Sequence, residues 1–290
     1  MTITEQADLT GNALNAQRFQ MLEDIAAELS GEVVFPTCFD LAVRIRKALR
    51  DTDQPLSRIA EQIGLEPLIG SKLLSMANSV AFNPAGIVVK DLKTAISRLG
   101  LETVRSTAMT ITMGQMLRSR EMANFEEMAH WLWQHSILAA SATYILAKRM
   151  TRFNPDEAMM AGLVHDLGAF YMLYRAAQYS ELRARPDTVK FLIAQWHESI
   201  GLSVLAALGM SEDMIEAVRD HDVLRPAPAQ PKTLNDVVYL GNILAGGRFE
   251  WMHQDIDQDT IDKYALGEVY TSLKEEIQAH AAQMTSVFGE

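Results

Sequence analysis

The sequence predicts an all-α protein, and three observations support this fold class. Apolar residues recur every three or four positions, as in Met21, Leu22, Ile25 and Leu29, which is the period of an amphipathic helix. Ala, Leu, Met and Glu, which favour helices, are common, whereas alternating runs of strand formers are scarce. Glycine and proline stand between the periodic segments. With 290 residues, 48% of them hydrophobic, the chain can bury a sizeable core.

In the first half, Gly31 and Pro36 separate two apolar stripes, because proline cannot continue a helix. Pro55 and Pro67 each suit the first position of a helix, where the missing N–H costs nothing. Gly100 ends another helix and separates it from the next. These signals predict the helices 21–29, 41–49, 55–64, 67–83, 91–99 and 102–117.

In the second half, apolar stripes continue at helical spacing up to residue 245. The segment 223–232 contains three prolines and is expected to be an extended linker. A last stripe begins at Ile256 and ends at Met284. We therefore predict the helices 131–150, 155–167, 190–208, 213–221 and 234–245, followed by a helical carboxy-terminal extension.

Composition and charge exclude several classes of protein. Cys38 is the single cysteine, so no internal disulfide can form, and a reducing cytoplasm is the expected location. The first 20 residues do not resemble a secretory signal, and no run of 18 apolar residues could cross a membrane. The net charge of −11 disfavours nucleic-acid binding. Residues 55–80 resemble a helix-turn-helix, but their charges sum to zero, so a packing role is favoured over DNA binding.

Five residues of the second half could bind a divalent metal ion. Imidazole nitrogens and carboxylate oxygens are ordinary ligands for such ions, and ligands from separate helices of a bundle can converge. The alternative is that each histidine is satisfied individually within the core. Gly162 and Gly168 flank the adjacent His-Asp pair, and we expect them to let the backbone turn there. The five residues are His135, His165, Asp166, His197 and His221.

Residues 162–168, Gly-Leu-Val-His-Asp-Leu-Gly, together with His135, His197 and His221, resemble the HD superfamily of metal-dependent phosphohydrolases. Leu73-Leu-Ser-Met-Ala-Asn-Ser and Ala95-Ile-Ser-Arg-Leu-Gly resemble the HDOD domain, a related output domain of bacterial signalling proteins. The resemblance implies an HD-like helical bundle with an amino-terminal helical subdomain. It divides the chain into a flexible leader (1–20), an amino-terminal helical part (21–118), an HD-like bundle (119–245) and a carboxy-terminal helical extension (246–290).

Departures from the active-hydrolase pattern bear on function. Asn242 stands where the resemblance places a late ligand Asp, and Ala169 stands where the cyclic-dinucleotide hydrolases have Lys. No Gly-Tyr-Pro follows His221-Asp222, and Asp220 replaces a histidine. We therefore assign no catalytic residue. Asn242 joins the five residues above as a candidate ligand for an ion that could be Mn, Fe, Zn or Mg.

The resemblance implies a non-catalytic regulatory module that acts through protein contacts. Its expected partners are signalling proteins: a sensor kinase, a response regulator or a diguanylate-type enzyme. The alternative is a metal-dependent phosphohydrolase with an altered ligand set, in which His197 or His221 compensates for Asn242. The apolar stripe from Val269 to Met284 could pack on its own domain or form a homodimer.

Overall fold

The computed structural model describes residues 12–30, 55–65, 67–80, 82–117, 120–247 and 265–288. Within these ranges every regular element is a helix, which confirms the all-α prediction. In chain order they are α1 (Asn12–Ser30), α3 (Leu56–Gly64), α4 (Pro67–Ala77), α5 (Leu92–Leu99), α6 (Leu101–Leu117), the 3-10 helix η1 (Arg120–Phe125), α7 (Glu126–Met150), α8 (Pro155–Val164), α9 (Leu167–Ala176), α10 (Ser180–Arg183), α11 (Pro186–Ala207), α12 (Glu212–Ala217), α13 (Leu234–Leu244), α16 (Glu268–Thr271) and α17 (Lys274–Phe288).

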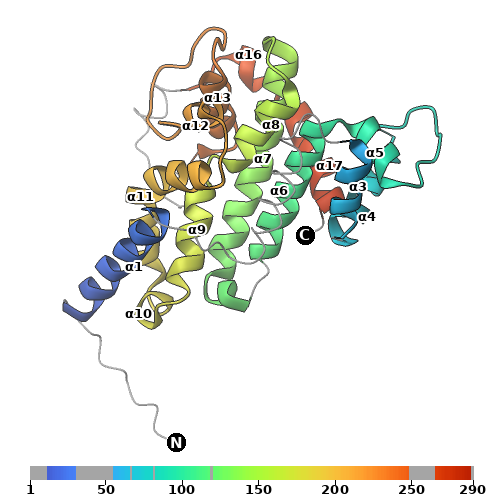
Figure 1. Ribbon diagram of the computed structural model, residues 1–290. Helices are drawn as coiled ribbons and strands as arrows, with labels where there is room; N and C mark the ends of the chain where they lie inside the picture. Colours follow the sequence, from blue (N-terminus) through green and yellow to red (C-terminus); the bar gives the residue numbers. More distant parts are fainter. Residues whose placement is uncertain are drawn as a thin grey trace, which may run out of the picture.

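The long helix α7 lies at the centre of the bundle, and α6, α8, α13 and α17 pack along it (Figure 1). Its small residues, among them Ala139, Ala140 and Ala142, are fully buried, which allows neighbouring helices to approach closely. Gly162 of α8 and Gly241 of α13 both lie against Thr143, where a Cβ atom on either glycine would collide with that side chain. The close packing fixes α8 and α13 relative to α7.

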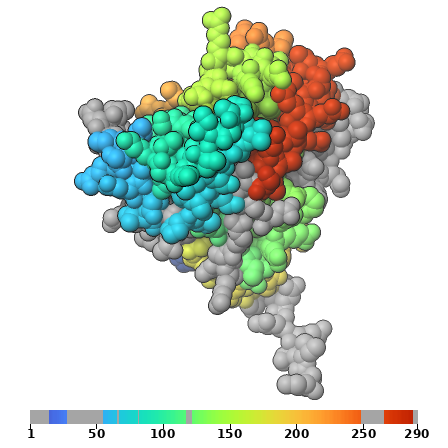
Figure 2. Space-filling view, turned by 90° about the vertical axis from the view of Figure 1, so that its right-hand side faces the viewer, coloured from blue at the N-terminus to red at the C-terminus, as the bar shows by residue number. Residues whose placement is uncertain are grey.

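Helices α3, α4 and α5 form a smaller lobe, coloured blue to cyan beside α17 in Figure 2. Ile59, Ile63, Ile69 and Leu73 are at most 2% exposed, so the apolar faces of α3 and α4 form part of the core. This burial is the packing role that the sequence favoured for the segment resembling a helix-turn-helix. The continuous hydrophobic core includes residues on both sides of residue 118.

Several predicted boundaries differ from the structure. Helix α1 begins at Asn12, so residues 12–20 are helical although the sequence assigned them to a flexible leader. Helix α7 begins at 126 instead of 131, α11 begins at 186 instead of 190, and α12 ends at 217 instead of 221. The predicted helix over 41–49 and the part of the last stripe from 256 to 264 lie outside the described residues. No helix in the described ranges is both long and apolar enough to span a bilayer.

Helix α9 was not predicted. Leu167, Ala169, Phe170, Met172 and Leu173 are all 0% exposed, so apolar residues surround the helix on every side. The sequence predicted one helix ending at residue 167, because no glycine or proline stands between Val164 and Leu167 to separate α8 from α9. Its position is important for the site, because α9 begins directly after Asp166.

Candidate metal centre

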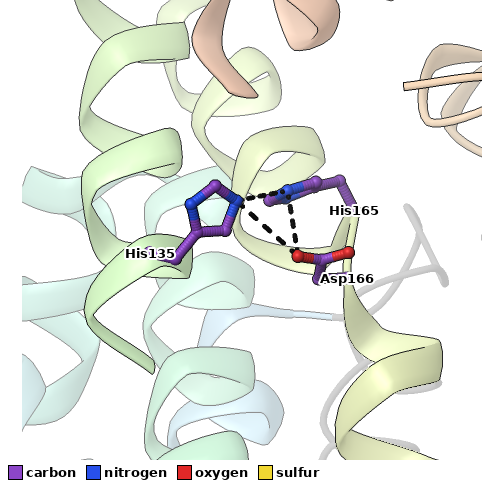
Figure 3. A group of neighbouring side chains, drawn as sticks. All are labelled: His135, His165 and Asp166. Carbon is purple, nitrogen blue, oxygen red and sulfur yellow. Dashed lines mark hydrogen bonds and ion pairs between the residues drawn. The ribbon is translucent and has the colours of Figure 1, made fainter. Parts of the chain in front are cut away.

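A first group of possible ligands lies where α7 meets the junction between α8 and α9. His135 projects from α7, whereas His165 follows the last residue of α8 and Asp166 precedes the first residue of α9 (Figure 3). The Nε2 atoms of His135 and His165 are 3.1 Å apart. Asp166 Oδ2 lies 3.6 Å from the first and 3.4 Å from the second. These three side chains therefore present one ligand atom each to a common point.

A second group shares the same aspartate. His197 comes from α11 and His221 from the loop after α12, and their Nε2 atoms are 3.3 Å apart. The other oxygen of Asp166, Oδ1, lies 3.5 Å from His197 Nε2 and 3.2 Å from His221 Nε2. Asp166 therefore stands between two groups of three ligand atoms, with one carboxylate oxygen facing each.

Backbone carbonyl groups fix the orientation of all four imidazole rings. His165 Nδ1 lies 2.7 Å from the Gly162 oxygen, and His197 Nδ1 lies 2.7 Å from the Ile193 oxygen. The Nδ1 atoms of His221 and His135 lie 2.8 and 3.2 Å from the carbonyl oxygens of Val218 and Ala245. A carbonyl oxygen can only accept, so each Nδ1 is the protonated nitrogen that donates. In the neutral form of each ring, Nε2 is then left with a lone pair, as in histidines that bind metals.

These residues fit a divalent ion. Two Nε2 lone pairs that face each other at 3.1 or 3.3 Å repel unless a metal ion lies between them or one of the two rings carries a second proton. A four-coordinate ion with ligands at 2.0–2.1 Å holds its ligand atoms roughly 3.3–3.4 Å apart, and the six spacings within the two groups run from 3.1 to 3.6 Å. An imidazole-rich donor set suits Zn or Fe better than Mg.

The pKa values reflect a buried centre with strong internal interactions. Burial lowers the pKa of His165 to about 4. Burial would raise the pKa of Asp166, but the surrounding histidines, His165 first, hold it well below its usual range. For His221, burial opposes protonation, yet Asp222 and Asp166 together raise its pKa to about 9. Protons therefore compete with a metal ion for this centre near neutral pH.

All six residues predicted from the sequence lie in this region, and each is at most 4% exposed. Asn242 is the one outside the two groups. Its Nδ2 donates to the His221 carbonyl oxygen at 3.0 Å and to Asp222 Oδ1 at 2.9 Å. Its Oδ1 is buried and has no hydrogen-bond partner among the described residues.

Asp222 is a polar residue of this region that the sequence analysis did not select. Its side chain is 7% exposed, and its Oδ2 lies 3.4 Å from His197 Nε2. Burial would raise its pKa, but His221 and His197 lower it to about 2. The signal was present in the sequence, because His221-Asp222 repeats the pairing of His165-Asp166.

Gly162 and Gly168 have a different role from the one predicted. The backbone at His165 is helical, and Asp166 has a φ of −98°, so the chain makes no turn that requires glycine. Instead, Gly168 lets α9 approach α11: a Cβ atom there would fall on the carbonyl oxygen of His197 and lie 2.5 Å from the Gly201 nitrogen. Gly162 thus brings α8 against α7, and Gly168 brings α9 against α11, so that the ligands of these helices meet.

Comparison with known proteins agrees with this geometry. The model of the HDOD domain matches residues 35–224. The chain belongs to the HDOD family. An uncharacterised protein of Treponema pallidum (strain Nichols) is 25% identical over an alignment of 215 residues. The alignment covers 69% of this chain and only 40% of that protein's length.

Two solved structures share the HDOD fold of this chain. One is named as a candidate metal-dependent phosphohydrolase from Shewanella amazonensis SB2B, with 21% identity, a TM-score of 0.64 and coverage of 92% of this chain and 99% of the other. The second is named as a candidate signal transduction protein from Marinobacter aquaeolei VT8, with 19% identity, a TM-score of 0.57 and coverage of 98% and 68%. The family and fold predicted from sequence are thereby confirmed.

Proposed function

We propose that this HDOD protein is a regulatory module of bacterial signal transduction that binds divalent metal at its buried centre and performs no turnover. Its partners are proposed to be signalling proteins of the cytoplasm: a sensor kinase, a response regulator, a diguanylate-type enzyme or a second copy of the chain. The fold-sharing proteins include one named for signal transduction. The ligands proposed for the ions are the four histidines and Asp166.

The pocket beside the centre carries this proposal. It has a volume of about 320 Å³ and borders the centre through His197 and Asp222. Its remaining lining residues are Ala194, Gln195, Glu198, Val223 and Leu224, so within the described part of the chain its walls hold two carboxylates and no Lys or Arg. Phosphate esters are anionic and are normally bound by Arg, Lys or a metal ion. The lining side chains therefore supply no positive charge of their own for a phosphate group, which would depend on the bound ions alone.

One specific observation favours the alternative, a phosphohydrolase with an altered ligand set. Asp166 bridges two groups of ligands, and paired metal ions are common in enzymes that cleave phosphate esters. Bound ions would supply Lewis acidity and a water of lowered pKa at this place. The chain itself would hold those ions through His135 and His165 on one side and through His197 and His221 on the other.

One pair of measurements separates the two functions. The protein is purified after growth with Mn, Fe or Zn, its metal content is determined by mass spectrometry, and hydrolysis of bis(p-nitrophenyl) phosphate and of a cyclic dinucleotide is followed. We expect bound metal, and hydrolysis no faster than that of the His165→Ala variant. Steady hydrolysis that His165→Ala abolishes would support the phosphohydrolase. Metal-free protein with no thermal shift on adding ions would overturn metal binding, because an ion that binds only the folded state raises stability.

A further inference from the structure

The loop that carries His221 and Asp222 is held from one face of α13. Asn235 Nδ2 lies 2.7 Å from the Arg219 carbonyl oxygen, and the Arg225 N–H donates to the Tyr239 hydroxyl at 2.9 Å. Asn242 completes the series, since positions 235, 239 and 242 follow one another at helical spacing. Each of the three residues binds the loop, so Asn242 belongs to a set of anchoring residues.

The backbone of this loop is strained at Asp220, whose φ of +53° is uncommon for a residue other than glycine. The N–H of Asp220 donates to Glu198 Oε1 at 2.9 Å, which holds this conformation. Strained residues persist where surrounding contacts determine them, and they cluster at functional sites. The strain here directly precedes His221 and Asp222.

Asp222 faces the second group of ligands with an oxygen that lacks a hydrogen-bond partner. Its Oδ1 accepts from Asn242, whereas its Oδ2 is buried and accepts from no donor among the described residues. Oδ2 lies 3.4 Å from His197 Nε2, and in the neutral ring that nitrogen presents a lone pair because Nδ1 donates to the Ile193 carbonyl oxygen. A buried carboxylate oxygen beside an imidazole nitrogen is stabilised by a cation between them, which is either a proton carried by His197 or a metal ion.

We propose that Asp222 is a carboxylate ligand of the ion held by His197, His221 and Asp166, and that Asn242 is a positioning residue that orients Asp222. This inference rests on the metal centre of the proposed function and deepens it. The negative charge that the active hydrolases place at the position of Asn242 is then supplied by Asp222. An ionised Asp at 242 could not donate a hydrogen bond to Asp222, whereas the amide of Asn can, so the two residue types are suited to each other.

The test is a Co²⁺ titration of the full chain, stripped of metal, followed by visible absorption and by metal content. We expect the wild type to bind two ions. Asp222→Asn should weaken the second ion by about 100-fold or more and leave the first unchanged, since even residues that only orient ligands contribute 10–100-fold. Asn242→Asp should weaken the second ion by about 10–100-fold, because it removes the donor to Asp222. The matched control is Asp213→Asn, an exposed carboxylate of α12, which should bind like the wild type.

Several outcomes would overturn the inference. If Asp222→Asn binds two ions with wild-type affinity, Asp222 is not a ligand, although the metal centre stands. If Asn242→Asp binds the second ion more tightly, Asn242 is itself the ligand. A wild type that binds no ion removes both the metal centre and this inference. Circular dichroism of each stripped variant verifies folding, and should Asp222→Asn fail to fold, Asn242→Asp decides the question because it leaves Asp222 in place.

Discussion

The contact between α9 and α11 gives the sharpest prediction for a single substitution. Gly168 is the second residue of α9, and it faces the backbone of α11 near His197. In Gly168→Ala the new methyl group would fall on the His197 carbonyl oxygen and lie 2.5 Å from the nitrogen and 2.8 Å from the Cα of Gly201. All three atoms belong to the backbone, so no side chain can rotate away and the two helices must separate.

The magnitude follows from the nature of this clash. Overpacking a core costs about 1–3 kcal/mol, and a clash with backbone belongs at the upper end or above it. The gain from replacing a helical glycine by alanine offsets only about 0.5–1 kcal/mol. A net loss of about 2–3 kcal/mol corresponds to a fall in Tm of roughly 4–12 °C for a chain of this size.

Gly201→Ala is the matched control, because it adds the same group from the other side of the same contact. Its Cβ atom would lie 3.2 Å from the Gly168 nitrogen and 3.5 Å from the Gly168 Cα, a contact that a small shift can relieve. Thermal unfolding and metal content are measured for both variants. We expect Gly168→Ala to melt lower and to lose metal, since Asp166 and His197 move apart, while Gly201→Ala stays near the wild type. Equal melting temperatures for the two variants would refute the packing argument.

Three further predictions concern other contacts of α7 and α17. Gly241→Ala should lower the free energy of unfolding by about 1–3 kcal/mol, because its Cβ atom would lie 2.5 Å from the Thr143 Cγ2 atom. Thr143→Ser removes that atom and should restore most of the loss in the double variant. Urea unfolding of the wild type, the two single variants and the double variant measures the coupling. Burial lowers the pKa of His280 in the folded protein. As the pH falls below about 6.5, the unfolded chain therefore binds a proton at this residue before the folded chain does, and the folded state loses stability. The Tm of His280→Gln should fall less than that of the wild type between about pH 7.5 and about pH 5.5, and an equal fall would contradict this. Arg149→Ala removes a bidentate ion pair, in which Nε and Nη2 donate to the carboxylate oxygens of Glu276 and join α7 to α17. The urea midpoint should fall slightly, and an unchanged midpoint would contradict a stabilising role for this pair.

Much of the fold could be predicted from sequence because most helices are amphipathic and end at glycine or proline. The pattern did not separate α9 from α8, because no glycine or proline stands between Val164 and Leu167. It also failed at loosely specified ends, such as the start of α7 at Glu126, five residues earlier than expected. Helix termini are poorly determined by local sequence.

The residue types of the site were predictable, but their grouping was not. Sequence could select His135 and His197 as buried candidates, yet it could not indicate that Asp166 separates them into two groups. That arrangement depends on how closely α7, α9 and α11 approach, which is set by glycines whose role lies in packing. Asp222 was missed although His221-Asp222 repeats the pairing of His165-Asp166, because the sequence does not show that the loop returns against α13 and brings Asp222 to His197.

The central claim is that the four histidines and Asp166 hold divalent ions. Anomalous diffraction from crystals of the protein grown with Zn²⁺, recorded on both sides of the zinc absorption edge, tests it most directly. The account predicts two peaks, one beside the Nε2 atoms of His135 and His165 and one beside those of His197 and His221, with a carboxylate oxygen of Asp166 next to each. Histidine pairs that contact each other directly, with no anomalous peak between them, would contradict it.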